Sequence, residues 1–105
     1  MTAFTGNTIT STPTIATATS TQVLAANGFR KFLLIQNASA ANIAISFEGA
    51  TLTGIAPTST NKCYVLASTA GNNFIRFDGG FVPGGAITAY QASGSPINTL
   101  VVIEG

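Results

Sequence analysis

The segment from Phe29 to Glu48 has the clearest pattern of hydrophobic and polar positions in the chain. Its second half, residues 42–48, alternates between apolar residues and polar or small ones, as a strand with one buried face does. In its first half, residues 32–35 are apolar on both faces. A strand of that kind is usually covered on both sides, by a second sheet or by a partner chain. Because only the small residues 38–41 separate the two halves, the pattern predicts a β-hairpin.

Other short runs of apolar and β-branched residues follow at intervals of about 8–12 residues, and no stretch has helical periodicity. The expected strands are residues 21–25, 29–37, 42–48, 50–56, 63–67, 74–78, 86–91 and 99–104. This spacing is typical of a β-sandwich or small barrel. We therefore expect an all-β fold, a jelly-roll-like β-sandwich of seven to eight short strands.

The first 21 residues differ from the rest of the chain. Nine of them are Thr, none is charged, and Pro13 prevents a helix through the middle. Thr is β-branched and favours extended backbone. The sequence predicts an extended N-terminal arm over residues 1–21, lying along its own domain or a neighbour, and a β-sandwich domain over residues 22–105. A disordered leader is the alternative. If the arm is a clamp, its removal should abolish binding to the partner and leave the domain folded.

Charge is scarce. The chain of 105 residues fits one domain, and 7% of its residues are charged, whereas an ordinary soluble domain has about 25%. The net charge is +1. Because such a surface does little to keep copies apart, we expect an oligomer or a lattice component. The alternative is a monomer with a surface of Thr, Ser, Asn and Gly.

Several classes of partner are not expected. Four scattered basic residues form no stripe along which nucleic acid could bind. No apolar run approaches the ~20 residues of a membrane-spanning helix, and the first residues lack the pattern of a secretory signal. The single cysteine, Cys63, excludes an internal disulfide and is expected to be a buried, inert thiol.

The residue types also argue against catalysis. The chain has no His, and its acidic residues Glu48, Asp78 and Glu104 each stand at a strand end beside or near Gly, the usual place for a solvated acid. Cys63 has no His to activate it. The glycine pairs at positions 79–80 and 84–85 do not have the spacing of a phosphate-binding loop. They predict loops in which the backbone φ angle is positive. We expect no enzyme activity, cofactor, metal or small-molecule substrate.

Some residues are better candidates for contact with a partner. Phe81 and Val82 are apolar residues in a glycine-rich loop; they form a contact patch, or Phe81 folds back and plugs one end of the sandwich. The cations either pair with acidic groups on a partner or with Asp78, or are solvated. The predicted contact residues are Phe4, Ile9, Ile15, Arg30, Arg76, Phe81 and Val82.

Residues 23–47 resemble small structural proteins of tailed bacteriophages. Those proteins often show an Ala-Asn-x-x-Arg-Lys-x-Leu-x-Ile-Gln-Asn segment, matched here by residues 26–37, then a Gly-rich middle and a closing hydrophobic strand ending in Glu-Gly. Residues 77–83 and 102–105 are similar to the later parts, so the likeness spans residues ~20 to 105.

The resemblance implies a virion component made in the host cytoplasm. The commonest such role for a small chain is a capsid decoration, or cement, protein: a β-sandwich, usually a homotrimer, that clamps major capsid protein subunits on the outer capsid surface. The alternative is a receptor- or glycan-binding module of a tail fibre or spike. The absence of Trp and the presence of only Tyr64 and Tyr90 count against that alternative.

Overall fold

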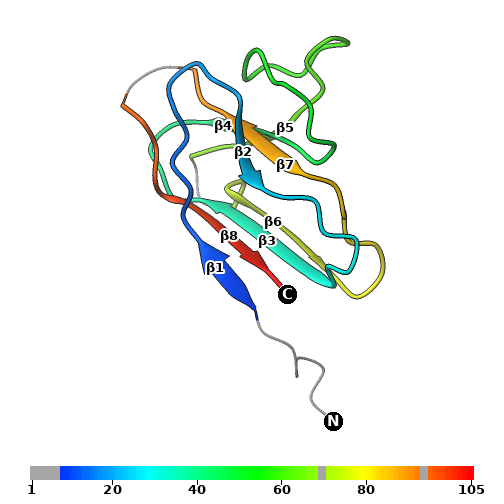
Figure 1. Ribbon diagram of the computed structural model, residues 1–105. Helices are drawn as coiled ribbons and strands as arrows, with labels where there is room; N and C mark the ends of the chain where they lie inside the picture. The colour runs from blue at the N-terminus through cyan, green and yellow to red at the C-terminus, as the bar shows by residue number, and fades with distance from the viewer. Residues whose placement is uncertain (1–7, 69–70, 93–94) are drawn as a thin grey trace.

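The computed structural model describes residues 8–68, 71–92 and 95–105. It consists of two four-stranded antiparallel sheets packed face to face, with strand orders β1-β8-β3-β6 and β2-β7-β4-β5 (Figure 1). The strands are β1 (Ile9–Ser11), β2 (Thr21–Leu24), β3 (Phe32–Asn37), β4 (Ile43–Ser46), β5 (Tyr64–Leu66), β6 (Phe74–Asp78), β7 (Ile87–Tyr90) and β8 (Leu100–Glu104). The described residues contain no helix, so the predicted all-β sandwich is confirmed.

The strand pairs are nested. β1 pairs with β8, β2 with β7, β3 with β6 and β4 with β5, all antiparallel. Each of the first four strands thus pairs with its counterpart among the last four, counted from the opposite end of the chain. Two further pairs, β3 with β8 and β4 with β7, join these ladders into the two sheets. A register shift in β2 between Gln22 and Leu24 marks a bulge at that edge.

The core lies between the sheets and follows from the alternation of residues along each strand. Leu33 and Ile35 of β3 point inward and are fully buried, as are Ile43 and Ile45 of β4. Burial of one such side chain contributes about 1.5–3 kcal/mol to folding. The buried cluster is Ile15, Val23, Leu33, Ile35, Ile43, Ile45, Leu66, Ile87, Ala89, Ile97, Leu100 and Val102.

The predicted hairpin is wrong, because β3 and β4 lie in different sheets. The chain crosses from one sheet to the other after Asn37, which is buried at the end of β3. Its side-chain amide donates to the carbonyl oxygens of Ala41 at 2.7 Å and Leu66 at 3.0 Å. These bonds hold the crossing against β5 of the opposite sheet. Two strands that each bury one apolar face give the same pattern whether they pair or face each other.

The described part of the N-terminal segment lies along its own sandwich. β1 pairs with β8, and Ile15 exchanges backbone hydrogen bonds of 2.7 and 3.0 Å with Ile97. The Ile15 side chain is fully buried. Residues 8–21 are therefore hydrogen-bonded to the rest of the domain.

The strand expected over residues 50–56 is absent from the structure. Residues 49–61 form an irregular segment that runs beside β7 and β5 (Figure 1). Thr88 of β7 donates its hydroxyl to the Ala50 carbonyl oxygen at 2.6 Å, and the backbone amide of Leu52 donates to the Ser20 hydroxyl at 3.0 Å. Through these contacts the segment covers the outer face of the sheet β2-β7-β4-β5.

Candidate functional site

The outer face of the sheet β1-β8-β3-β6 carries large apolar side chains that stay partly exposed. Phe74 is 49% exposed, and the other four are half-buried. The strand register places Leu34 between Ile103 and Arg76, and Gln36 between Val101 and Phe74. We call this surface the apolar sheet face; it consists of Phe32, Leu34, Phe74, Val101 and Ile103.

The outer face of the other sheet has the opposite character. It presents small and polar residues, among them Ala44, Ser46 and Thr88, yet these are buried, and the hydroxyls of Ser46 and Thr88 hydrogen-bond to the backbone of Ala50 in the segment 49–61. An antiparallel sheet with one face in water normally turns polar residues outward. Here the face beneath the segment 49–61 is polar, and the face with partly exposed side chains is apolar, which makes the apolar sheet face a candidate contact surface.

Two charged residues stand on the apolar sheet face, both on its edge strand β6. Arg76 Nε lies 3.3 Å from Asp78 Oδ2, and the side chains are 59% and 52% exposed. An exposed pair of this kind contributes at most about 1 kcal/mol to stability. Arg76 thus pairs with Asp78, one of the alternatives that the sequence left open, and its contact with a partner stays a prediction.

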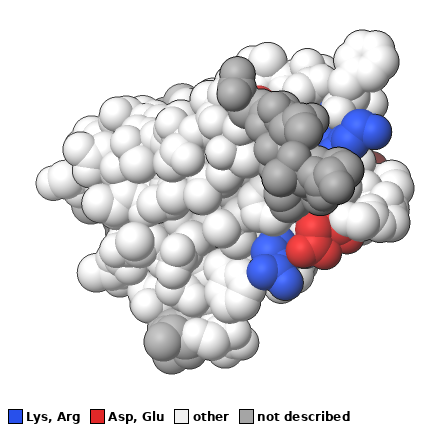
Figure 2. Space-filling model, turned by 90° about the horizontal axis from the view of Figure 1, so that it is seen from below, with Lys and Arg blue, Asp and Glu red and all other residues white. Residues whose placement is uncertain are grey.

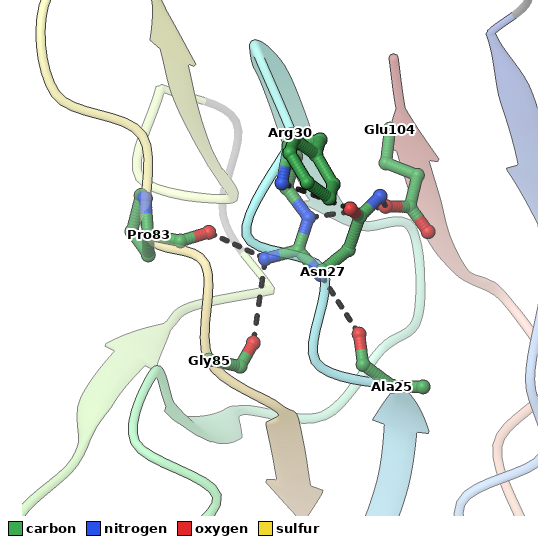
Figure 3. Close-up of polar contacts among 7 residues, drawn as sticks. Ala25, Asn27, Arg30, Pro83, Gly85 and Glu104 are labelled. Carbon is green, nitrogen blue, oxygen red and sulfur yellow. Dashed lines mark hydrogen bonds and ion pairs between the residues drawn. The ribbon is translucent and has the colours of Figure 1, made fainter.

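Arg30 was among the expected contact residues, but its side chain has no exposed surface. Its Nε lies 3.1 Å from Glu104 Oε1, and its other nitrogens donate to the carbonyl oxygens of Pro83, Gly85 and Ala25 (Figure 3). The guanidinium thus joins the end of β8 to the loop before β7 and the turn after β2. A charge can be buried here because each of the three guanidinium nitrogens donates to an oxygen acceptor and a carboxylate balances the charge.

The turn and the loop that Arg30 joins each expose a phenylalanine. Phe81 is 78% exposed and Phe29 is 91% exposed. The turn is tied to the loop by a bond of 2.9 Å from the Asn27 amide to the Gly84 carbonyl oxygen. Of the two alternatives for Phe81, an exposed contact residue or a plug at one end of the sandwich, the structure shows the exposed one. Val82 packs against the core. Phe29 was not among the predicted contacts, because its run of residues matched a strand.

The glycines of this loop meet different requirements. Gly79 has a positive φ of 64°, as predicted. Gly85 does not; a Cβ there would lie 3.0 Å from the Phe47 carbonyl oxygen. The close approach of the loop to the strand end thus requires glycine at position 85.

The remaining predicted contact residues lie apart. Ile9 on β1 is 63% exposed, whereas Ile15 is in the core and has no surface to offer a partner. Phe4 falls outside the described residues.

A shallow groove of about 380 Å³ opens beside β4 and β5. Tyr64, 47% exposed, and Phe47 form its aromatic wall, with ring centroids 6.5 Å apart. Glu48 and Lys62 also line it, together with Cys63. Burial raises the pKa of the Cys63 thiol, which keeps it in the protonated, unreactive form.

The described residues bring no three His, Cys, Asp or Glu side chains together in a group suited to a metal ion. In the same ranges no helix has the length and hydropathy to cross a bilayer. Seen from below, the charged side chains gather at one side of a surface that is otherwise uncharged (Figure 2).

Comparison of the chain with protein-family models, with curated proteins and with solved structures finds no match.

Proposed function

We propose that this chain is a structural protein of a phage virion: a decoration, or cement, protein that binds and stabilises the shell of the major capsid protein. It acts without catalysis, as a homotrimer on the outer capsid surface. The observation that carries the proposal is the apolar sheet face, whose large side chains stay partly exposed in a chain with 7% charged residues. Exposed apolar patches on a protein surface commonly mark the sites where other proteins bind.

We also propose that the sandwich is a jelly roll. Support comes from the nested strand order, in which each strand of the first half pairs with its counterpart in the second half. Jelly rolls are double-sheet folds of eight strands and are frequent among viral capsid domains. The strand order therefore agrees with the virion role.

In this proposal Phe81 and Phe29 contact the capsid. Both are held on segments that the buried Arg30 joins, so little freedom is lost when they bind. Exposed aromatic side chains contribute much of the binding energy at interfaces. A protein that binds the assembled shell and not its separate subunits stabilises the shell by mass action.

Pelleting with purified shells of the phage that encodes the chain tests this function. The wild-type chain should co-sediment at hundreds of copies per shell, a rough figure for this class of protein. The substitution Phe81→Ala should weaken binding about tenfold or more, because it removes one aromatic anchor. Tyr64→Ala is the control, since Tyr64 lies in the groove and outside the proposed contact. Wild-type chain that stays in the supernatant would refute the proposal.

One observation favours the receptor- or glycan-binding alternative. Tyr64 and Phe47 give the groove an aromatic wall, and Lys62 and Glu48 supply polar groups beside it. Aromatic rings with nearby polar groups are what the sugar-binding hypothesis requires. In that case a glycan array would give signals that Tyr64→Ala abolishes and Phe81→Ala leaves unchanged.

A further inference from the structure

We propose that Asn27 is a site of spontaneous deamidation. Its side chain reacts with the backbone nitrogen of Gly28, closes a succinimide ring and releases ammonia, and water then opens the ring to an aspartate or an isoaspartate at position 27. The reaction needs no enzyme and no co-reactant other than water. It goes beyond the proposed function, and only its effect on shell binding rests on that function.

The first step concerns the nitrogen that attacks. Asn27 and Gly28 are exposed and lie in the turn between β2 and β3. Within the part of the chain that the structure describes, the Gly28 backbone amide donates to no acceptor. Apart from the chain neighbours of Gly28, no heavy atom lies within 4 Å of the place that a Cβ would take. Neither a hydrogen bond nor a side chain therefore keeps this nitrogen from the Asn27 side chain.

The second step concerns the amide group that is attacked. Asn27 Oδ1 accepts a hydrogen bond of 3.0 Å from the backbone amide of Phe29. This bond closes an Asx turn, which folds the side chain back over the Gly28 peptide. When the Gly28 nitrogen bonds to Cγ, negative charge develops on Oδ1, where the Phe29 N–H already donates. The turn thus brings the reacting groups together and stabilises the charge that forms.

The third step is the balance of the reaction. The bond between the Gly28 nitrogen and Cγ forms, and the bond between Cγ and Nδ2 breaks. The proton that the Gly28 nitrogen loses leaves with Nδ2, as ammonia. Water then adds to one of the two ring carbonyl carbons. Addition at Cγ restores the normal backbone with an aspartate side chain, and addition at the backbone carbonyl carbon gives isoaspartate.

Conversion changes the cluster that joins the two loops. Asn27 Nδ2 donates to Glu104 Oε1 at 3.0 Å, so an acid at position 27 loses this bond and places a second carboxylate beside the first. Isoaspartate also lengthens the backbone by one methylene ahead of Phe29. Because Arg30 joins this end of β2 to the loop that carries Phe81, we expect the converted chain to bind shells about tenfold more weakly.

Incubation of the folded, full-length chain followed by peptide mass spectrometry tests the inference. The peptide that contains Asn27 should gain the mass difference between an amide and an acid, and part of the product should be isoaspartate. The rate should rise with pH, because the Gly28 nitrogen must lose its proton. Asn98 is the internal control: it is also exposed, but Thr99 follows it, and a β-branched side chain hinders the approach.

Gly28→Ala is the matched variant. Gly28 does not have a positive φ, and a Cβ there has open space, so the variant should keep the fold. It should slow conversion at least about tenfold, because the new methyl group crowds the attacking nitrogen. Equal rates for the wild type and Gly28→Ala would overturn the inference. So would an Asn27 that stays intact in the folded chain and converts only in urea, because the native turn would then protect it.

The inference and the proposed function fail separately. A chain that converts at Asn27 but never binds shells supports the inference and overturns the function. A chain that binds shells and keeps Asn27 intact overturns the inference and leaves the function standing. Converted chain that binds shells as tightly as fresh wild-type chain would refute the effect on binding.

Discussion

The guanidinium of Arg30 donates to four oxygen atoms from three segments of the chain. One of them belongs to Glu104, whose carboxylate also accepts from Asn27 at 3.0 Å. The side chain of Arg30 is 0% exposed and that of Glu104 is 16% exposed, so the ion pair is largely shielded from water. Arg30 is thus a structural residue that fixes the position of the loops carrying Phe29 and Phe81.

At this scale we predict that Arg30→Met lowers the free energy of unfolding by roughly 3–5 kcal/mol, because removing one member of a buried ion pair leaves its partners without bonds. Arg76→Met is the matched control. It also breaks an ion pair with a carboxylate, but an exposed one, and should change stability by about 0.5 kcal/mol. Urea unfolding at neutral pH measures both. Equal decreases in the free energy of unfolding for the two variants would show that the burial of Arg30 contributes nothing to stability.

The sequence could predict that Arg30 is charged and near a turn, but not that it is buried. Its acceptors at positions 25, 83, 85 and 104 come together only through tertiary structure. Conversely, Phe81 was recognised as a contact candidate because glycines surround it, whereas Phe29 precedes an apolar run and looked like part of a strand. Local pattern identifies residue types, and packing decides their exposure.

Among the elements, the segment 49–61 shows most clearly how polar side chains replace strand pairing. Asn61 is 5% exposed and its amide nitrogen donates to the carbonyl oxygens of Gly54 at 2.9 Å and Ala56 at 3.0 Å. Its Oδ1 accepts from the backbone amide of Thr53 at 2.8 Å. One side chain thus holds the segment in shape over the outer face of the sheet β2-β7-β4-β5.

We therefore predict that Asn61→Ala lowers the free energy of unfolding by about 1–3 kcal/mol, because it leaves buried donors and acceptors unpaired. The amide of Thr53 should exchange its hydrogen faster, while the amides of β3 and β8 stay protected. Asn98→Ala, at an exposed position, is the control. Hydrogen exchange followed by NMR measures the effect. An unchanged rate at Thr53 would mean that the segment holds its shape without Asn61.

Pattern at the element scale predicted where most strands lie and which sides face inward, but not how they pair. The strands expected over residues 29–37 and 42–48 are observed as the shorter β3 and β4. Their assignment to different sheets depends on contacts with β6, β8, β5 and β7, far away in the sequence. Apolar and polar positions alternate every two residues along a strand whichever strand it pairs with, so this pattern does not identify the partner strand.

For the molecule as a whole, the position of Ile15 decides where the folded domain begins. Removal of residues 1–21 was expected to leave the domain intact, but it would also remove a fully buried core side chain and the strand β1. The burial of Ile15 could not be predicted from the Thr-rich sequence, because a single isoleucine among hydroxyl residues gives no alternation of apolar and polar positions. The part of this segment that the structure describes is joined to the core through Ile97 and Gln91.

Two substitutions within the same Thr-rich segment test this view of the molecule. Ile15→Ala should lower the free energy of unfolding by roughly 2–5 kcal/mol, because it opens a cavity between the sheets. Ile9→Ala removes the same atoms from a side chain that is 63% exposed, and should change stability by about 0.5 kcal/mol or less. Both are measured by thermal and urea unfolding of the full-length chain. Two small, equal effects would place the segment outside the cooperative unit and return residues 8–21 to the role of a detachable arm.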